Sequence, residues 1–358
     1  MARKVIHVGV GLFGQRWCRD FLPPNIQDGT IEVVAIADVD PAAVERGRQI
    51  LGLPAERCYS DPAKAFAAHA SGEDRADFCT IVVPPAHHEK IVDLAVAHGV
   101  DILSEKPIAD TMAASLRIAA KVKKAGRKMA VTMSHRFDQD KTTLRALIRS
   151  GVLGKVNTVS LRYAADLRKH MAWGALFRHE MQDPLLIEGA VHHLDIIADL
   201  AGGRCETLYA STWRPGWAEY KGDTDGMVMM TFANGVRGIY EGTSTSAAGL
   251  NDWSREYVRV DCELGSAVLT SREIEIFKRV DLPRQRNREG QGQKIQLLTQ
   301  PKWFNTWLIE RFARWIGGGE ALETHVEANL QASALVFGAI ESARTGAVVK
   351  VQELLKAA

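Results

Sequence analysis

Apolar segments of strand length alternate with amphipathic segments through the first 134 residues of the chain. Strands are predicted at residues 4–9, 31–37, 76–83, 101–104 and 129–133. Helices are predicted between them, at residues 15–22, 41–51, 63–69, 89–98 and 111–125. Such an alternation is typical of a parallel sheet whose strands are joined by right-handed helical crossovers. This part of the chain is therefore predicted to form an α/β domain.

The pattern changes after Ser134, where longer apolar strands and hairpins replace the alternation. Strands are predicted at residues 156–164, 206–213, 225–232, 236–245, 256–263, 267–271, 273–280 and 348–351. Asn234-Gly235 separates two of them and is a strong signal for a two-residue hairpin. Helices are predicted at residues 140–150, 187–200, 303–316 and 325–345. We predict an α/β domain over residues 1–134 and an α+β domain with a mainly antiparallel sheet over residues 135–358.

Two segments of the second domain differ sharply in polarity. Residues 227–232 are apolar at every position except Thr231, whereas a sheet with one face in water alternates apolar and polar residues. The outer face of this strand is interpreted either as an interface between copies of the chain or as part of a locally apolar core. Residues 282–294 are polar and basic without an aromatic residue, and we interpret them as a solvated loop rather than a nucleic-acid patch.

Composition and charge exclude several classes of function. The chain has 358 residues, of which 46% are hydrophobic and 25% are charged, as expected for a globular protein with a sizeable core. A formal net charge of +2 gives no reason to expect nucleic acid or an acidic membrane as a partner. The five cysteines form no CxxC pair, which indicates neither a disulfide framework nor a thiolate zinc site and fits a reducing compartment. The sequence shows no signal peptide and no apolar run of ~20 residues, so a cytoplasmic protein is predicted.

Residues 9–14 form the pattern GxGxxG at the turn from the first predicted strand into the first predicted helix. Gly9 permits a tight turn, Gly11 lets the backbone approach a pyrophosphate, and Gly14 lets the helix pack closely on the strand. Leu12 and Phe13 complete the loop and are predicted to contact the same cofactor. The motif alone is weak, because an ordinary glycine-rich turn shows the same pattern.

Asp38 strengthens the dinucleotide interpretation. It ends the second predicted strand, about 20 residues beyond the glycines, where a ribose-binding acid is expected. A carboxylate there accepts hydrogen bonds from ribose hydroxyls and repels a 2′-phosphate, which favours NAD over NADP. The alternative is a turn aspartate that precedes Asp40-Pro41.

Two further loops follow predicted strands of the same domain. Pro84 begins the first loop, and His87 and His88 follow it. Without a third ligand nearby, the two histidines are interpreted as part of a loop beneath the cofactor rather than as a metal site. Glu105-Lys106-Pro107 ends the strand at residues 101–104. Chemistry collects at the carboxyl ends of parallel strands, so Lys106 is a candidate for acid/base work.

Glu188, His192 and Asp195 lie at positions i, i+4 and i+7 of a predicted helix and therefore share one face. A carboxylate one turn from an imidazole can orient the ring, and histidine has the ionisation range of a general base near neutral pH. Two alternatives stay open. One is a structural acid–histidine contact, the preferred interpretation for an isolated ExxxH, and the other is a metal site, for which two ligands are too few.

Taken together, these residues resemble the Gfo/Idh/MocA family of glucose-fructose oxidoreductase, inositol dehydrogenase and rhizopine catabolism proteins. The resemblance covers essentially the whole chain. It rests on residues 9–14, Pro84-Pro85-x-x-His88, Glu105-Lys106-Pro107, Arg136-Phe137, Gly151-x-x-Gly154, residues 188–195 and residues 342–346. It implies a Rossmann domain followed by a domain with a large open, mainly antiparallel sheet, through which members often assemble.

The resemblance also implies roles for individual residues. Lys106 corresponds to a lysine beside substrate and nicotinamide, and His192 corresponds to the usual base. Glu188 stands where the family has an aspartate, so it either pairs with His192 or contacts a substrate hydroxyl. Further cofactor contacts are expected from Pro84, His88, Glu105 and Lys106. Hydrogen-bonding and aromatic candidates for polyol binding are His135, Arg136, Arg162, Trp173, Arg178 and His193.

We therefore predict a cytoplasmic, NAD(P)-dependent dehydrogenase that uses Lys106, His192 and Glu188 and holds no metal. NAD is expected as cofactor, with NADP second. The substrate is expected to be a sugar, cyclitol or related polyol that is oxidised at a secondary alcohol, and the assembly a homodimer or homotetramer through the second sheet. Two alternatives are an NAD-dependent glycosidase that oxidises its substrate transiently and a dinucleotide-binding sensor without turnover.

Overall fold

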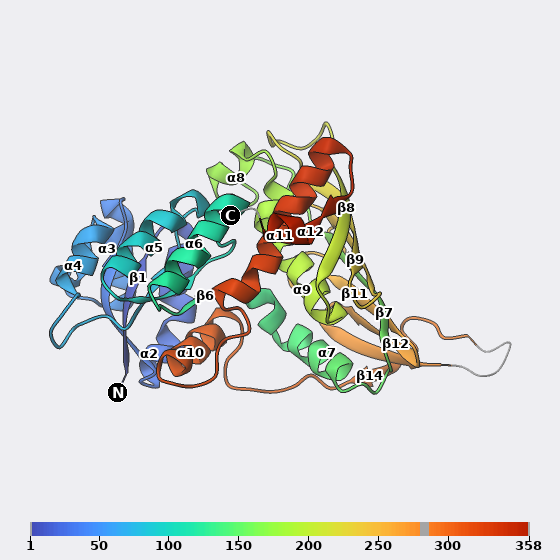
Figure 1. The fold of residues 1–358 in the computed structure, drawn as a ribbon, viewed down its shortest axis with the longest axis horizontal. Helices are drawn as coiled ribbons and strands as arrows, with labels where there is room; N and C mark the ends of the chain where they lie inside the picture. The colour runs from blue at the N-terminus through green and yellow to red at the C-terminus, as the bar shows by residue number, and fades with distance from the viewer. Residues whose placement is uncertain (1, 280–285, 357–358) are drawn as a thin grey trace. The chain divides into compact units, whose positions relative to one another are not determined.

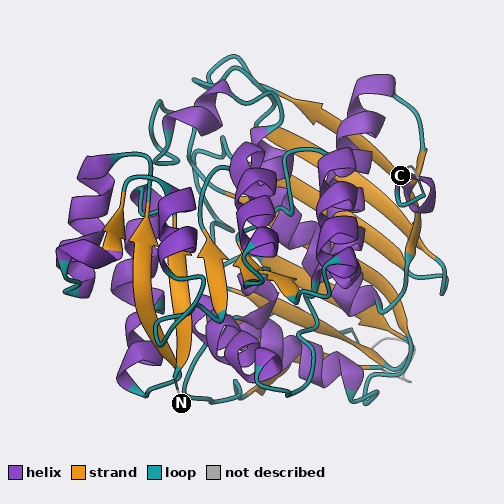
Figure 2. Cartoon of the chain, turned by 60° about the vertical axis from the view of Figure 1, so that its left-hand side comes forward, coloured by secondary structure: helices purple, strands orange, loops and turns teal. Residues whose placement is uncertain are grey.

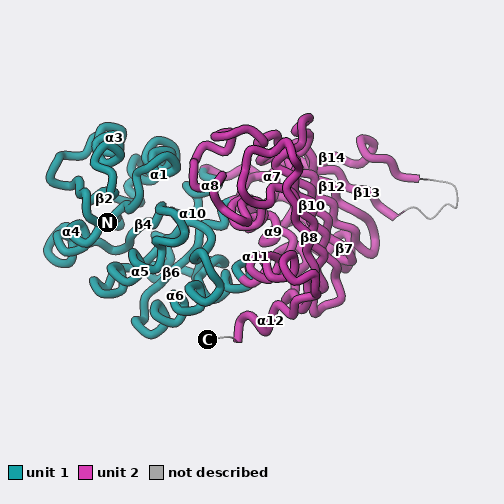
Figure 3. Tube along the Cα trace, turned by 90° about the horizontal axis from the view of Figure 1, so that it is seen from above, with its two compact units in different colours: residues 1–134, 302–333, 358 teal, residues 135–301, 334–357 magenta. Residues whose placement is uncertain are grey.

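The computed structural model describes residues 2–279 and 286–356 (Figure 1). The chain divides into two compact units, one of residues 1–134 and 302–333 and the other of residues 135–301 and 334–357 (Figure 3). The first unit thus contains a later segment, residues 302–333, which the predicted boundary after residue 134 assigned to the second domain. Each unit is built around its own sheet.

The sheet of the first unit has six strands, all paired in parallel. They are β1 (Arg3–Val8), β2 (Ile31–Ala37), β3 (Cys58–Tyr59), β4 (Phe78–Ile81), β5 (Asp101–Ser104) and β6 (Met129–Val131). Their order is β3-β2-β1-β4-β5-β6, which reverses between β1 and β4. Ligands bind beyond the carboxyl ends of strands at such a reversal point. The predicted Rossmann domain is confirmed.

Helices connect the strands of the first unit, and α10, from later in the chain, also belongs to this unit (Figure 1). They are α1 (Leu12–Arg16), α2 (Pro23–Gln27), α3 (Pro41–Leu51), α4 (Pro62–Ala68), α5 (His88–Ala97), α6 (Met112–Lys124) and α10 (Phe304–Ile316). Asp40 and Asp61 cap α3 and α4 by accepting hydrogen bonds from backbone N–H groups, and a proline follows each. Phe312 of α10 packs edge-on against Phe78 of β4, at 5.2 Å between ring centroids, which explains why α10 belongs to this unit.

The predicted helix at residues 15–22 is instead a mixture of short turns. Helix α1 ends at Arg16, the π-helix η1 covers Trp17–Phe21, and α2 begins at Pro23. Pro23 and Pro24 lack the N–H groups that would continue an α-helix, but both fit the first turn of a new one. The wider π-turn buries Trp17 and Phe21 together, with their rings 5.9 Å apart.

The described residues of the second unit form a nine-stranded sheet in the order β14-β13-β12-β11-β7-β10-β9-β8-β15. The strands are β7 (Val156–Ala164), β8 (Cys205–Trp213), β9 (Asp225–Phe232), β10 (Arg237–Thr243), β11 (Tyr257–Cys262), β12 (Gly265–Thr270), β13 (Glu273–Lys278), β14 (Gln293–Ile295) and β15 (Val349–Lys350). All neighbouring pairs are antiparallel except β7 and β10. The predicted mainly antiparallel sheet is confirmed, and Figure 2 shows its strands in orange.

The edge strand β14 was not predicted. Two of its residues, Gln293 and Lys294, lie at the end of the segment interpreted as a solvated loop, residues 282–294. Residues 282–285 of that segment, and Val280 at the end of a predicted strand, lie outside the described residues. The remaining residues 286–292 contain neither helix nor strand. Lys294 pairs with Glu273 at 2.8 Å, so this charged side chain of the segment lies on an exposed sheet edge.

Helices of the second unit cover one face of its sheet (Figure 1). They are α7 (Gln139–Arg149), α8 (Leu176–Glu180), α9 (Val191–Ala201) and α12 (Val351–Leu354); α11 (Val326–Thr345) begins in the first unit. Helix α9 packs on β7 and β10, and α7 packs on β12 and β13. The predicted helix at residues 187–200 is divided, because the π-helix η5 covers Leu185–Ala190 before α9 begins. Within the described residues, no helix has the length and apolar character to cross a membrane.

The other face of the sheet carries exposed apolar side chains. In β9, Val228 and Met230 are buried, whereas Met227 and Met229 are 51% and 62% exposed. The strand is therefore apolar on both faces, as predicted, and only one face is covered within the chain. We call this exposed set the apolar face; its residues are Tyr209, Trp213, Met227, Met229 and Ile239.

Close contact between α9 and β10 depends on a glycine. A Cβ at Gly238 would lie 2.8 Å from Cγ2 of Ile197 on α9 and 3.0 Å from Cε2 of Phe232. We expect Gly238→Ala to lower the free energy of unfolding by about 1–3 kcal/mol, because the stiff, branched Ile197 must move. Urea denaturation measures this. Gly216→Ala is the control, since nothing lies within 4 Å of its Cβ; equal stability of the two variants would contradict this packing.

Candidate functional site

The loop after β1 can be built only with glycine at two positions. Gly9 has a φ of +94°, and a Cβ there would lie 2.3 Å from the carbonyl oxygen of Val82. A Cβ at Gly14 would lie 2.0 Å from the carbonyl oxygen of Gly9. Gly11 differs, because nothing in the protein lies within 4 Å of its Cβ position. The chain itself gives no reason for glycine at this position, whereas the close approach of a dinucleotide does.

Asp38 lies beside this loop, at the end of β2. Its Oδ2 accepts a hydrogen bond of 2.8 Å from the backbone N–H of Val10, and its Oδ1 accepts one of 2.9 Å from Asp40. The carboxylate is partly exposed, and its remaining lone pairs can accept hydrogen bonds from hydroxyls. Leu12 and Phe13, at the start of α1, are exposed. The structure thus brings together the glycine loop and Asp38, the residues predicted to hold a dinucleotide.

Glu105 is buried under the segment that carries Lys106. Its Oε1 accepts hydrogen bonds from Trp17 Nε1 at 3.1 Å and Asn305 Nδ2 at 3.4 Å, and its Oε2 accepts one from the Lys106 backbone N–H at 3.2 Å. Burial raises the pKa of this carboxyl. Glu105 is 7% exposed, and its hydrogen bond with the Lys106 N–H fixes the backbone at that residue. Asn305 comes from α10, and nothing in the sequence links the two residues.

His88 is a second buried residue that holds loops of the first unit in place. It is fully buried at the start of α5, with Nε2 2.9 Å from the carbonyl oxygen of Val83 and Nδ1 3.2 Å from that of Ile108. Burial lowers its pKa. The ring thereby joins the loop that contains Pro84 to the segment that follows Lys106 and Pro107. This corrects the predicted direct contact, since a fully buried ring reaches a cofactor only through the loops that it holds.

Glu188 forms an ion pair in the second unit. The Arg178 side chain donates from Nε to Glu188 Oε2 at 2.8 Å and from Nη1 to the carbonyl oxygen of Trp173 at 2.7 Å. The guanidinium also lies over the Trp173 ring, 5.8 Å from its centroid. Three predicted residues are therefore brought together. Glu188 belongs to the π-helix η5, whose wider turn shifts it from the α-helical i, i+4 register with His192 on which the prediction relied.

His192 lies near the start of α9, where its ring faces other aromatic rings. Its centroid is 5.7 Å from that of His135 and 5.5 Å from that of Trp253. Trp253 stacks on His135 at 4.6 Å and is 38% exposed, so it offers indole surface beside His192. Sequence reasoning missed Trp253 and favoured Trp173. The sequence gives little sign of its role, because Trp253 is one of eight tryptophans and lies in a loop with no distinct pattern.

Four of the residues predicted to bind substrate lie outside the group formed by Glu188, Arg178 and Trp173. His135 and His193 are fully buried, so they support neighbouring side chains and do not meet a substrate. Arg136 is nearly buried between Asp195 and Asp199, at 2.7 Å and 3.1 Å. Arg162 pairs with Glu241 at 3.2 Å on the sheet face opposite α9. These placements correct the predicted substrate contacts of the four residues.

Asp195 belongs to this ion network. Burial raises its pKa to about 6, although the charge of Arg136 opposes the shift. For Asp199, burial alone would raise the pKa, but the charges of Arg136 and Arg145 outweigh it and lower the pKa. The network ties α7 to α9 through Arg145, whose Nε lies 2.5 Å from Asp199. It fixes the helix that carries His192.

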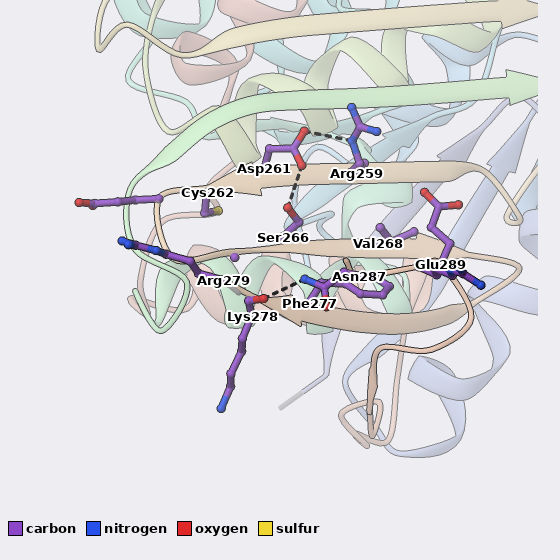
Figure 4. Close-up of a pocket in the computed structure, with 13 residues that line it drawn as sticks. Arg259, Asp261, Cys262, Ser266, Val268, Phe277, Lys278, Arg279, Asn287 and Glu289 are labelled. Atoms are coloured by element: carbon purple, nitrogen blue, oxygen red, sulfur yellow. Dashed lines mark hydrogen bonds and ion pairs between the residues drawn. The ribbon is translucent and has the colours of Figure 1, made fainter. Parts of the chain in front are cut away.

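A surface pocket of about 340 Å³ lies over β11, β12 and β13. Its polar groups bond with one another: Ser266 donates to Asp261 at 2.8 Å, Arg259 donates to Asp261 at 3.0 Å, and Asn287 donates to the carbonyl oxygen of Lys278 at 2.9 Å (Figure 4). None of the predicted site residues lines it. We do not assign a function to this pocket.

Comparison with known proteins gives matches over both units. A family model described as the oxidoreductase family with an NAD-binding Rossmann fold matches residues 3–133, and the GFO/IDH/MocA C-terminal domain matches residues 142–268. A protein of Sinorhizobium fredii (strain NBRC 101917 / NGR234), uncharacterized protein y4oX, is 59% identical over 99% of this chain and 98% of its own length. D-apiose dehydrogenase of Paraburkholderia graminis is 26% identical over 90% of this chain and 84% of its own length.

A solved structure shares the fold. It is an inositol dehydrogenase homolog from Azotobacter vinelandii, complexed with NADH and myo-inositol, with a TM-score of 0.80. The two chains are 19% identical, and the match covers 98% of each. At this level of identity the likeness shows the common fold alone.

The two glycines of the loop allow a paired test of the cofactor site. In Gly14→Ala the new Cβ meets the Gly9 carbonyl, so we expect a lower melting temperature and no NAD binding. In Gly11→Ala the new Cβ meets nothing in the protein, so we expect an unchanged melting temperature and NAD affinity reduced by at least about tenfold. Calorimetric titration with NAD and thermal melting measure both. Unchanged NAD affinity in Gly11→Ala would mean that no pyrophosphate approaches this loop.

Proposed function

The chain belongs to the GFO/IDH/MocA family of NAD-binding oxidoreductases, and we propose that it is a dehydrogenase of a sugar, cyclitol or related polyol. In this proposal a secondary alcohol of the substrate is oxidised, and NAD held by the glycine loop and Asp38 would supply the hydride acceptor. The observation that carries the proposal is the glycine loop, where Gly11 is open to a ligand and Asp38 is bonded to the same loop. The names of relatives that act on D-apiose or bind myo-inositol support the substrate class.

His192 is the proposed base. A neutral imidazole accepts the hydroxyl proton as the hydride leaves, and histidine is the side-chain type most often used for such proton transfer. Lys106 is proposed to donate a hydrogen bond to the same oxygen and to stabilise the negative charge that develops there. The backbone at Lys106 is held by buried Glu105, so little reorganisation is needed when charge develops.

The group formed by Glu188, Arg178 and Trp173 is proposed to bind substrate hydroxyls. Glu188 offers carboxylate oxygens as acceptors and Arg178 offers N–H donors, a combination that suits hydroxyls because each hydroxyl both donates and accepts. Trp253 adds an exposed indole beside His192, against which the C–H groups of a substrate can pack. Small-molecule sites combine such apolar surface with a few polar groups that fix orientation.

A substrate panel tests the proposed function directly. The enzyme is incubated with NAD or NADP and a set of aldoses, cyclitols and alditols, and NADH formation is followed by its absorbance. We expect turnover with at least one polyol and a preference for NAD, because Asp38 disfavours a 2′-phosphate. Hydrolysis of an aryl glycoside with catalytic NAD and no net NADH would instead indicate a glycosidase. NAD binding without any turnover would indicate a sensor.

Substitution of the two proposed catalytic residues tests their roles. We expect Lys106→Ala and His192→Ala each to lower kcat by about 10²–10⁴-fold, the usual range for a lost acid/base group, while NAD still binds. Stopped-flow hydride transfer and NAD titration separate the two effects. The exposed Lys90→Ala in α5 serves as a control for loss of a lysine. Near-parental kcat in either catalytic variant would contradict the assigned role.

The apolar face is proposed to bind a second copy of the chain. Five large apolar side chains on adjoining strands would otherwise remain in water, and continuous exposed apolar patches mark association surfaces. We expect Met227→Lys/Met229→Lys to reduce the mass measured by light scattering to that of one chain. Val152→Lys, at an exposed position outside this face, should leave the mass unchanged. A parent protein that is already monomeric at micromolar concentration would refute the interface.

A further inference from the structure

A buried cluster of charged side chains surrounds Glu256, the residue before β11. Its Oε1 accepts a hydrogen bond from His135 Nε2 at 2.8 Å and one from the Ser254 backbone N–H at 2.9 Å. Its Oε2 lies 2.9 Å from Lys141 Nζ, and His193 Nε2 lies 3.5 Å from Oε1. The side chains of His135, His193, Lys141 and Glu256 are at most 1% exposed. The proposed function uses none of these groups.

This cluster requires an additional proton to be neutral. Asp140 Oδ2 lies 3.2 Å from Lys141 Nζ, so two carboxylates face one ammonium. Burial alone would raise the pKa of Glu256, but the charges of His135 and Lys141 outweigh it and hold this pKa well below its ordinary value. With neutral imidazoles the cluster would carry one net negative charge away from water, which is costly. A second proton on one imidazole removes this cost.

The geometry selects His135 to hold this proton. Its contact with Glu256 is shorter than that of His193, at 2.8 Å against 3.5 Å. The other ring nitrogen of His193 faces the Tyr240 hydroxyl at 3.2 Å, and burial lowers the pKa of His193. The His135 ring also faces His192, 5.7 Å away between centroids. An imidazolium at His135 is therefore a positive charge beside the proposed base.

We propose that His135, held as an imidazolium by Glu256, is a positioning residue that keeps His192 in its neutral, proton-accepting form. A positive charge nearby disfavours a second one, so His192 releases its proton more readily while His135 is charged. Trp253, stacked on His135 and edge-on to His192, holds the two rings in this arrangement. The inference rests on the proposed function, in which His192 is the base.

Other charged groups near this region already have partners of opposite charge. Asp138 pairs with Arg272 at 2.6 Å, Asp195 with Arg136 at 2.7 Å and Glu188 with Arg178 at 2.8 Å. Tyr163 on β7 and Tyr240 on β10 face His193, and burial raises the pKa of both, so they are neutral. Each of these groups is compensated or uncharged, whereas the ring of His135 faces His192 directly.

The same cluster has the composition of a metal site. Ligand atoms of His135, His193 and Glu256 lie within 4.8 Å of one another. However, the ammonium of Lys141 lies 2.9 Å from the Glu256 carboxylate and supplies the positive charge that an ion would bring. A divalent cation beside this ammonium would be strongly repelled. We therefore interpret the cluster as a proton-holding network.

Titration of His192 by NMR tests the proposal without any assumption about turnover. The His192 ring resonance is identified by its loss in His192→Gln, and its midpoint is then compared in the parent, His135→Gln and His135→Phe. His135→Gln keeps a donor for Glu256 but removes the charge, and His135→Phe keeps a ring against Trp253 and also removes the charge. We expect both variants to raise the His192 midpoint by about one pH unit, because its protonated form is no longer disfavoured.

Kinetics of the same variants separate charge from loss of structure. The acid limb of the kcat/KM profile should move to higher pH by the same amount, with kcat at high pH within about threefold of the parent. A purely structural role would lower kcat at every pH and leave the midpoint in place. Asp140→Asn/Lys141→Met is the matched control: it removes one anion and one cation, leaves Glu256 to hold the proton on His135, and should keep the parental midpoint.

The possible outcomes distinguish this inference from the proposed function. A His192 midpoint in His135→Gln that stays within about 0.2 units of the parent, or falls, overturns the inference. A raised midpoint in an enzyme that oxidises no polyol leaves the inference standing and removes the proposed function. If His135→Phe does not fold, His135→Gln, which retains the hydrogen bond, decides the matter.

Discussion

One buried carboxylate, that of Glu256, holds together the elements of the second unit that surround His192. It receives His135 from the segment after β6, Lys141 from α7, and His193 from α9, and it also binds the backbone of its own loop. Loss of one partner from a buried ion pair costs about 3–5 kcal/mol, because the other charge is left without compensation. The placement of His192 therefore depends on a charge cluster that water does not reach.

The first unit uses a buried carboxylate in a similar way. Glu105 accepts hydrogen bonds from Trp17 and Asn305 on one oxygen and from the Lys106 backbone on the other. Its partners come from η1 and α10, which are far apart in the sequence. The balance at this carboxyl is nevertheless different: burial raises its pKa, although the charge of Lys106 opposes the shift. Glu105 thus fixes backbone geometry, whereas Glu256 organises charge.

The sequence was sufficient for much of the fold because local periodicity and glycine spacing are properties of short segments. The parallel order of the first sheet, the mainly antiparallel second sheet and the glycine loop beside Asp38 all follow from such segments. The environment of the predicted site residues did not follow. The His135–Glu256 contact spans 121 residues of sequence, and no local pattern tells a buried histidine from one that faces a substrate.

The two π-helices limited prediction in another way. A π-turn changes the residues that share a helix face, but its sequence reads as an ordinary amphipathic helix. At Leu185–Ala190 this difference changes the direction in which Glu188 projects. The ion pair that Glu188 forms with Arg178, at 2.8 Å, was not visible from the sequence.

The ion pair changes the interpretation of Glu188, which stands where the resemblance implies an aspartate. A shorter aspartate on the same backbone would reach about 1.5 Å less far, one carbon–carbon bond, and Arg178 would need to move to follow it. The longer side chain therefore fits a site in which the carboxylate is directed toward the segment of Trp173 and Arg178. If this group binds substrate as proposed, we expect it to favour a hydroxyl-rich substrate without net charge over an anionic one, because Glu188 already compensates the guanidinium.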